Sequence, residues 1–519
     1  MTSTMSVVKR NVQHSGSRSS LDSEQYLDDS FSKNVLSGGS RTESIREVFL
    51  RVFPAIAVSS LSAWIFGYHL GVVNGSLEYL ANDLGFASST GLKGLVVSIT
   101  LVGATFGSFA AGKRRIVGRA GSLSEEYGRC YALRVASLPL ILGPVLSAAA
   151  TTPRVLILGR LLAGLGIGVT STVVPVYLSE CSPPAVRGVL GSTNQLGICL
   201  GILSALVLGV PLESNAGWWR HMFDISSIPA FLLTAATFWV PDSPRWLAKK
   251  GRRAEAYVAG VWLWGTCSDA DLGLGVEDGG EGAATAPCKE EMSWIGLLMS
   301  KHRKVVLVGA MLFMLQQLSG INAVIYFSSS VFREAGLQAG VLASAGVGLI
   351  NVLGTLMAGS MLDRYGRKPL LIGSYCGMGL CMLLQAVTML LGQLTARMAV
   401  PCALVGTLAY VLAFAMGAGP IPGLLLGEIL PADVRSKASS IAMASHWVFN
   451  FAIGQGFLPA CAALGTAYVY LGFAVTCFLA AAFSKQFLIE TKGRTLEEIE
   501  TEMHALLNTP STIANPALS

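Results

Sequence analysis

The sequence predicts an all-α membrane protein with twelve transmembrane helices in two pseudo-symmetric six-helix halves. Three observations support this fold class. Hydrophobic residues make up 52% of the 519 residues and charged residues only 13%, against about 25% charged in soluble globular domains. Apolar runs of roughly 20 residues, long enough to cross a bilayer, recur along the chain. Motifs of the first half also return in the second half.

The apolar runs set the expected spans and the domain limits. The expected spans are 50–76, 92–112, 133–150, 155–177, 189–211, 225–241, 304–328, 340–361, 369–392, 399–426, 438–463 and 466–487. The expected domains are a disordered tail (1–45), a six-helix half (46–241), a linker with short helices (242–303), a second six-helix half (304–490) and a tail (491–519). The linker flanks, SPRWLAKKGRRAEAYVAGVW and EEMSWIGLLM, read as amphipathic helices.

Charge sets the orientation. Lys and Arg concentrate in the loops after spans 2, 4, 6, 8 and 10. The opposite loops hold only Lys93, Arg154, Arg220, Arg333 and Arg397. The positive-inside rule therefore places the first set of loops and both termini on the cytoplasmic-equivalent side. The net charge of +6 reflects this topology, and we expect no nucleic-acid partner.

The two halves repeat each other with a fixed offset. Glu180 in SECSPPAVRG precedes Arg187 by seven residues, and Glu428 in GEILPADVRS precedes Arg435 by seven. The two pairs are 248 residues apart in the chain.

The same offset of 248 relates Asp242 to Glu490, and SEEYGR (124–129) recurs as LDRYGR (362–367). Duplicated six-helix halves are an architecture of alternating-access transporters, whose binding site lies between the halves near the bilayer midplane.

Charged residues cluster at the cytoplasmic-side ends of several spans. We expect them to form ion pairs between the halves that hold the inner gate shut and exchange partners as the halves rock. The alternative is interfacial anchoring. The expected inner-gate network is Arg160, Glu180, Arg187, Asp363, Arg364, Arg367, Glu428 and Arg435.

Arg160 differs from the others because it lies within span 4, in LILGRLLAGLGIG. A charged residue within a span is costly and is therefore a functional candidate. The alternative is that its side chain snorkels toward the helix end.

Amides and aromatic side chains recur inside the spans. Neutral amides both donate and accept hydrogen bonds, as sugar hydroxyls require, and an aromatic face covers the apolar side of a pyranose ring. Bonding between helices is the alternative for any single amide. The SGI sequence after the two glutamines of span 7 permits an unwound turn. The expected substrate-binding residues are Gln195, Gln316, Gln317, Asn322, Tyr326, Asn351, Trp447, Asn450 and His69.

Several motifs together resemble the sugar porter family of the major facilitator superfamily. They are GRLLAGLGIG, PVYLSECSPPAVRG, PDSPRWL, QQLSGINAVIYF, DRYGRK and ETKGRTLEEIE, and the resemblance covers about residues 50–505. Within the family, FGYHLGVVNGSLEYL, STNQLGICLGIL, MGAGPIPGLLLGEIL and HWVFNF are similar to the plastidic glucose transporter group of plants and algae.

The resemblance implies hexose transport by alternating access. It implies that the six amides bind hexose hydroxyls, that Trp447 lines the site, and that the charged residues at the span ends, Arg129 among them, form the inner gate. It also implies the chloroplast inner envelope as the location. The basic, acid-free first 20 residues fit a transit peptide, whereas the acids at 22–29 argue against one. The plasma membrane is the alternative.

The chain departs from the resembled family at three places. Gly423 follows PIP where animal glucose facilitators carry Trp, so sugar selectivity cannot be copied across. His446 precedes Trp447 where Asn is common. About nine extra residues near KRRIVGRAG interrupt the junction after span 2, and Glu125 and Glu126 stand where the motif has Asp and Arg. The insert is either real or an artefact such as unspliced codons.

His69 raises the question of energy coupling. It is the only histidine, acid or base in the apolar run 52–77. Proton-coupled members of the resembled family carry Asp after FGY, and no acid of this chain lies in the middle of an expected span. A neutral imidazole hydrogen-bonds without a counter-ion, so we expect a facilitative uniporter with His69 lining the site. Proton symport through His69 and a structural role for His69 are the alternatives.

Other classes of function are not favoured. No nucleotide-binding loop or catalytic triad is present, so we expect no enzyme, cofactor or nucleotide. The ten cysteines have no metal-ligand or disulfide spacing and read as packing residues. The expected partners are a monosaccharide and the lipid bilayer. A polyol, inositol or pentose carrier remains an alternative, as does a sugar sensor, although sensors usually have longer tails.

Overall fold

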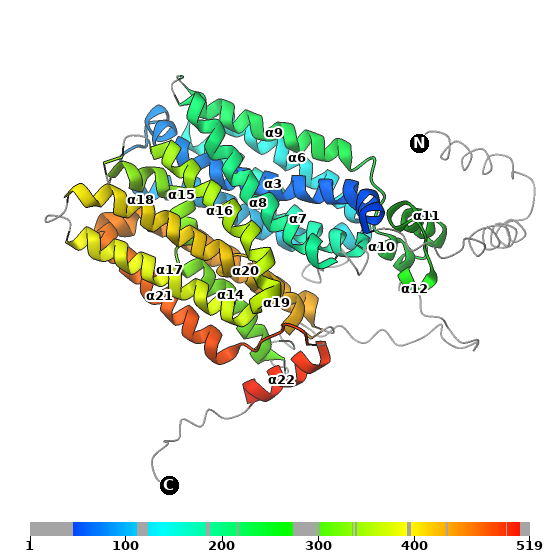
Figure 1. Ribbon diagram of the computed structural model, residues 1–519. Coiled ribbons are helices and arrows are strands. Elements are labelled where there is room, and N and C mark those ends of the chain that lie inside the picture. Colours follow the sequence, from blue (N-terminus) through cyan, green and yellow to red (C-terminus); the bar gives the residue numbers. More distant parts are fainter. Residues whose placement is uncertain are drawn as a thin grey trace, which may run out of the picture.

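The computed structural model is a bundle of long helices (Figure 1). It describes residues 45–111, 123–182, 187–213, 215, 217–272, 297, 302–334, 336–337, 340–391, 396–431, 434–494 and 496–508. All the regular elements in these ranges are helices. The N-terminal tail 1–44, the KRRIVGRAG insert and most of EEMSWIGLLM lie outside the described residues.

Six long helices form the first half. They are α3 (Ile45–Asp83), α4 (Thr90–Ala111), α6 (Arg129–Ala148), α7 (Pro153–Cys181), α8 (Arg187–Leu212) and α9 (Trp218–Ala236). The short α5 (Leu123–Glu126) precedes α6. The linker holds α10 (Pro244–Lys249), α11 (Arg253–Trp264) and α12 (Asp269–Leu272), which confirms the helical prediction for its first flank.

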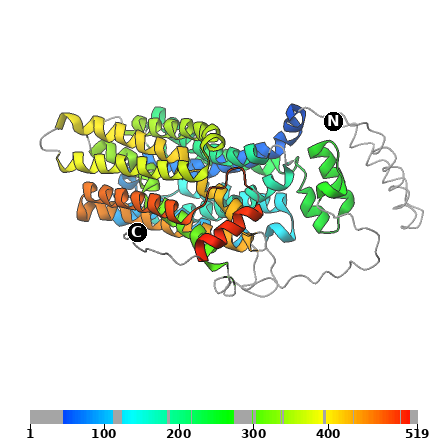
Figure 2. The same ribbon diagram turned by 60° about the horizontal axis from the view of Figure 1, so that its bottom comes forward.

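The second half repeats the pattern with two interrupted helices. Its elements are α14 (Arg303–Leu318), α15 (Ile321–Glu334), α16 (Gly340–Tyr365), α17 (Arg367–Leu390), α18 (Ala396–Ala413), the π-helix η2 (Phe414–Ala418), α19 (Ile421–Ile429), α20 (Arg435–Leu464) and α21 (Thr466–Phe487). A final helix, α22 (Leu496–Asn508), lies against α19 and α14 at one end of the bundle (Figure 2).

Eleven of the twelve expected spans coincide with helices that are long and apolar enough to cross a membrane. The remaining one, expected at 225–241, corresponds to α9, which lies beside α6 (Figure 1) but starts seven residues earlier, at Trp218. The start was misplaced because Trp, Arg and His open this helix and lower its hydropathy. Asp224 therefore lies inside a helix rather than in a loop, with its side chain exposed on the outer surface of the bundle.

The expected single span at 304–328 is broken in two. Gly320 separates α14 from α15 and has φ +91°, a conformation that only glycine adopts at little cost. A Cβ on Gly320 would also lie 2.5 Å from the Phe473 ring. The SGI sequence therefore forms the interruption that it was expected to permit.

Small residues bring helices into close contact. A Cβ on Gly67 of α3 would lie 1.9 Å from the Ile198 carbonyl oxygen of α8, and one on Gly201 of α8 would lie 2.1 Å from the Trp64 carbonyl oxygen of α3. This backbone-to-backbone packing is typical of membrane helices. The two halves meet where α4 packs on α20, α8 on α16, and α3 on α15.

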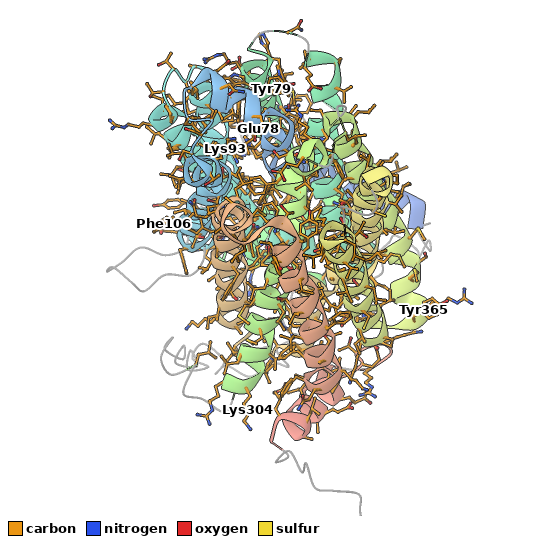
Figure 3. All side chains as sticks on the ribbon, turned by 90° about the vertical axis from the view of Figure 1, so that its left-hand side faces the viewer. Glu78, Tyr79, Lys93, Phe106, Lys304 and Tyr365 are labelled. Carbon is orange, nitrogen blue, oxygen red and sulfur yellow. The ribbon has the colours of Figure 1, made fainter. Side chains whose placement is uncertain are left out.

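The outside of the bundle is apolar. Phe106, labelled in Figure 3, is 61% exposed, and Phe231 is 66% exposed. Large exposed apolar side chains around a bundle of this length fit contact with lipid tails.

Linker helices α10 and α11 mark one end of the bundle, called the inner end here. The Trp246 indole nitrogen donates to the Glu125 carbonyl oxygen at 2.9 Å, and the Trp264 indole nitrogen donates to the Cys181 carbonyl oxygen at 2.8 Å. These bonds hold the linker helices against the first half.

Candidate functional site

A chain of hydrogen-bonded amides lies at the break between α14 and α15. Asn322 Nδ2 donates to Gln317 Oε1, and Gln317 Nε2 donates to Gln316 Oε1 at 3.2 Å. Gln317 Nε2 also lies 2.9 Å from Nδ1 of His446 on α20. The break at Gly320 brings Asn322 back onto the face of the two glutamines, so three of the expected residues form one network.

The other end of this chain is fixed by the second interruption. Gln316 Nε2 donates to the Ala418 carbonyl oxygen at 2.6 Å and to that of Gly419 at 3.4 Å. The Ala418 carbonyl is available because residue 422, four positions further along the chain, is a proline and has no N–H to donate. Two irregular helices of the second half therefore hold the amide pair from both sides.

Aromatic side chains of α15 and α20, Tyr326 and Trp447, also belong to the expected site. The Tyr326 hydroxyl donates to Asn450 Oδ1 at 3.2 Å. Trp447 packs edge-on against Phe66 of the first half, with ring centroids 5.6 Å apart. Its buried indole nitrogen has no hydrogen-bond partner among the described residues. Trp447 therefore lies at the junction of the halves and has a donor to spare.

Gln195 on α8 and Asn351 on α16 are linked through Cys199 and Thr355. Gln195 Nε2 lies 3.6 Å from the sulfur of Cys199, which in turn lies 3.3 Å from the Thr355 hydroxyl. Thr355 donates to the backbone carbonyl of Asn351 at 2.8 Å. The side-chain oxygen of Asn351 is buried without a partner in the described structure. A buried acceptor of this kind costs about 1–3 kcal/mol unless a ligand or water satisfies it.

His69 is 1% exposed on α3, and its Nε2 has no partner among the described residues. Arg160 is close enough to act on it electrostatically.

The placement of Arg160 in the inner-gate network was wrong. Arg160 Nε donates to the Val96 carbonyl oxygen at 2.6 Å, and Nη2 donates to that of Val97 at 3.2 Å. About 20 residues of α7, or ~30 Å of helix, separate it from Glu180. Arg160 is 3% exposed, so it does not snorkel to the helix end either. The charge is held by backbone carbonyls of α4 inside the first half.

At the inner end, Arg129 joins two acids of the first half. It forms a bidentate pair with Glu180, with Nε to Oε2 and Nη2 to Oε1 both at 2.9 Å. Nη2 also donates to Glu125 Oε1 at 3.0 Å. Glu125 therefore pairs with the motif arginine although it replaces the expected Asp.

The second half repeats this arrangement. Arg367 Nη2 donates to Glu428 Oε1 at 3.1 Å, and the Thr491 hydroxyl donates to Glu428 Oε2 at 2.5 Å. Arg435 Nε donates to the Leu430 carbonyl oxygen at 3.0 Å, and Arg364 lies over the Tyr365 ring.

In this conformation the ion pairs of Arg129 and Arg367 stay within one half, and the expected exchange of partners between the halves stays a prediction. Each of these arginines binds acids of its own half, because α6 packs beside α7 and α17 lies close to α19. The side chains of Arg187 and Asp363 lie outside the described residues.

Asp242 and Glu490 belong to the inner end but were not expected to be functional. Asp242 accepts the backbone N–H groups of Arg129 and Cys130, at 2.9 and 3.3 Å. Glu490 accepts those of Arg367 and Lys368, at 2.9 and 3.0 Å. Each carboxylate thus caps the helix that follows the YGR motif. The repeat offset of 248 was the signal in the sequence.

The YGR glycines make this capping feasible. Gly128 and Gly366 precede the capped helices with φ +110° and +89°. A Cβ on Gly128 would lie 2.2 Å from Asp242 Oδ2, and one on Gly366 would lie 2.6 Å from Glu490 Oε2.

A group of polar contacts between the halves lies at the opposite end, called the outer end here. Asn74 of α3 donates to the Ile325 carbonyl oxygen at 2.6 Å and to the Ser328 hydroxyl at 2.7 Å, and accepts the Ser329 N–H at 3.1 Å. Glu213, after α8, pairs with Arg333 of α15 at 2.9 Å.

Tyr79 completes this group. Its hydroxyl donates to Glu213 Oε1 at 2.6 Å and accepts from Arg333 Nη2 at 3.2 Å. Tyr79, Glu78 and Lys93 gather at one end of the molecule, opposite Lys304 and Tyr365 (Figure 3). In the sequence, Arg333 and Lys93 indicate only topology, and this group was not expected because its partners come from different halves.

Comparisons with known proteins agree with this architecture. The model of the family described as "Sugar (and other) transporter" matches residues 55–503. Plastidic glucose transporter 4 of Arabidopsis thaliana is 47% identical over 449 residues, covering 86% of this chain and 80% of that protein. The glucose transporter GlcP of Staphylococcus epidermidis is 34% identical, covering 86% and 96%.

Among solved structures, the xylose transporter XylE from E. coli in a partially occluded inward-open conformation superimposes with a TM-score of 0.70. It is 27% identical, and the match covers 86% of this chain and 99% of that one. A family model across most of the chain and a relative at 47% identity leave no ambiguity: this chain is an integral membrane protein that belongs to the Sugar (and other) transporter family, whose members are transporters and not enzymes.

Proposed function

We propose that the chain carries a hexose, glucose in the first place, down its concentration gradient by alternating access. The observation that carries this proposal is the amide chain of Gln316, Gln317 and Asn322 beside Trp447, at the junction of the two halves. Spare amide groups bind hydroxyls, and the indole ring covers an apolar sugar face. The names of the relatives support glucose as the substrate.

Gln195, Asn351, Asn450 and Tyr326 extend the proposed site. The buried side-chain oxygen of Asn351 can accept a hydrogen bond from a sugar hydroxyl. Gln195 comes from the first half, on α8, which packs on α16. Groups from both halves around one ligand are what alternating access requires, because the ligand must contact whichever half is closing.

The absence of a buried carboxylate at the expected coupling position supports facilitated diffusion rather than symport. His69 stands at this position and is buried on α3. Asp224, an acid inside a helix, is exposed on the outer surface. Proton coupling through His69 is the competing function, because the buried imidazole is a titratable group without a hydrogen-bond partner on Nε2.

We also propose the plastid envelope as the location, with the plasma membrane as the alternative. The proposal rests on the 47% identical plastidic relative. A fluorescent fusion of the full chain tests it by coincidence with a chloroplast envelope marker.

The proposed substrate is tested with purified protein in liposomes. Uptake of labelled glucose is expected to saturate and to be inhibited by excess unlabelled glucose more strongly than by xylose, a polyol or inositol. A stronger effect of xylose or inositol would assign a different cargo. Binding of glucose without any uptake would favour a sugar sensor.

A further inference from the structure

His446 occupies the end of the amide chain and acts there as an acceptor. Its Nδ1 lies 2.9 Å from Gln317 Nε2. An amide nitrogen only donates, so Nδ1 carries the lone pair and the imidazole proton is on Nε2. Edge-on contacts to Phe313 and Trp447, at centroid distances of 5.4 and 4.9 Å, hold the ring in this orientation.

The contact with His446 uses one of the two N–H groups of Gln317. The other N–H group donates to Gln316 Oε1 at 3.2 Å. Gln317 Oε1 accepts from Asn322 Nδ2. Gln317 therefore has no free donor and keeps only acceptor capacity on Oε1.

Gln316 is in the same condition. Its Nε2 donates to the carbonyl oxygens of Ala418 and Gly419, and its Oε1 has one lone pair left after accepting from Gln317. The two neighbouring glutamines, which the sequence suggested as both donors and acceptors, thus present acceptors alone.

We infer that His446 is a positioning residue that makes the Gln316–Gln317 pair accept only, so that the sugar hydroxyl meeting this pair must donate its proton. The inference rests on the proposed function. Without His446, one N–H of Gln317 is released and the same hydroxyl is bound in either direction. The Asn common at this position in sugar porters carries both donor and acceptor and does not fix the direction of the chain.

Sugar analogues distinguish the two directions. Replacing a hydroxyl by hydrogen removes both donor and acceptor, whereas fluorine keeps a weak acceptor and never donates. We therefore compare deoxyglucose and fluorodeoxyglucose at each carbon as competitors of labelled glucose uptake. In the wild type, at the carbon facing the pair, both analogues are expected to bind roughly three- to tenfold more weakly than glucose and within about twofold of each other.

In the variant His446→Leu, the fluoro analogue is expected to bind about threefold more tightly than the deoxy analogue at that carbon, because the freed N–H of Gln317 donates to fluorine. His446→Met, which also lacks a nitrogen acceptor, serves if the Leu variant fails to assemble. The matched control is His221→Leu on the exposed surface of α9, which should leave the ratio unchanged. A ratio of two affinities cancels any general loss of active protein.

Two results would overturn the inference. The first is that fluoro analogues bind more tightly than the deoxy analogues at every carbon in the wild type. The second is that both His446 variants keep the wild-type ratio of fluoro to deoxy affinity. Failure of the proposed function looks different. A wild type that binds glucose without moving it contradicts transport alone, and the same ratios are then read from competition for binding.

Discussion

Arg333 Nη2 lies 2.9 Å from Glu213 Oε1 and ties the second half of the protein to the first at the outer end. The described ion pairs of the YGR arginines at the inner end stay within one half: Arg129 pairs with Glu180 and Glu125, and Arg367 pairs with Glu428. The outer end is therefore the closed end in this conformation.

Breaking the outer ion pair should open the outer end more often. The Arg333 and Glu213 side chains are 30% and 29% exposed, and such pairs contribute about 0.5–1 kcal/mol. Glu213→Gln should thus raise the open population roughly two- to fivefold. A cysteine at Val341, which is buried near Gly75 and Gly209 at this contact, reports opening through its labelling rate by an impermeant maleimide.

Charge exchange provides the control for this prediction. The double variant E213R/R333E should restore the labelling rate to within about twofold of the wild type. Glu255→Gln, which breaks the Arg252–Glu255 pair on the linker, should not change it. Equal labelling in Glu213→Gln and the wild type would show that the pair does not bias the equilibrium.

Gly366→Ala should destabilise the protein through the inner-end cap. The added Cβ would lie 2.6 Å from Glu490 Oε2 at a φ of +89°, and strain of this kind costs about 1–3 kcal/mol. We expect the thermal unfolding temperature in detergent to fall by a few degrees. Gly373→Ala, within α17 with open space around its Cβ, should leave it unchanged or raised, because Ala favours helix. Equal effects of both changes would contradict the capping account.

The two capping carboxylates should respond to pH in opposite directions. Burial raises the pKa of Asp242, and the hydrogen bonds from backbone N–H groups only partly offset this. Burial also acts to raise the pKa of Glu490, but four backbone N–H groups outweigh it and hold that pKa below its usual range.

The sign of each effect follows from proton linkage. Glu490 stabilises the fold above the unfolded pKa of about 4.3, and this contribution is lost as the pH falls through its lower folded pKa. Asp242 weakens the fold as the pH rises from about 3.9 through its raised folded pKa. Glu490→Gln should therefore lower the free energy of unfolding more at pH 7 than at pH 3. Asp242→Asn should lower it more at pH 3 than at pH 7. Unfolding measured over this pH range tests both.

Asn351→Leu should separate stability from sugar binding. The buried Asn351 oxygen lacks a described partner, so its removal relieves a desolvation cost of about 1–3 kcal/mol. We expect an unchanged or higher unfolding temperature together with a KM for glucose raised about threefold or more. A lower unfolding temperature with an unchanged KM would make Asn351 a structural residue.

Hydropathy and the repeated motifs predicted most of the fold, because spanning helices must be apolar throughout. They misplaced α9, whose first turn holds Trp218, Trp219 and Arg220. The SGI sequence was expected only to permit an unwound turn, and the structure places the break there, at Gly320. The π-helix η2 was not predicted, since FAMGA gives no period of its own.

The candidate site was predicted in its parts more than in its pairings. The amides on α14 and α15 follow from residue type and spacing. The partners of Arg129 and Arg367 could not be predicted from the sequence. The repeat places an equivalent acid, Glu180 or Glu428, in each half, so each arginine has a possible partner in both halves. His446 was noticed only as a departure from the resemblance, and its contact with Gln317 depends on how α20 packs on α14.

Whether the protein is a facilitator or a proton symporter depends mainly on the role of His69. His69→Gln keeps a neutral hydrogen-bonding side chain next to Arg160. It should therefore transport glucose within about threefold of the wild type, a loss no larger than one weakened hydrogen bond. A carrier that moves protons through His69 would instead lose accumulation in this variant. Initial rates of labelled glucose uptake, with and without a proton gradient, measure both properties.

The most direct test of the central claim is the steady-state glucose concentration ratio across wild-type proteoliposomes under an imposed proton gradient. Facilitated diffusion predicts a ratio of one with or without the gradient, and no glucose-dependent change in the signal of a trapped pH dye. A ratio above one that collapses when a protonophore is added would contradict the account and make His69 the coupling residue.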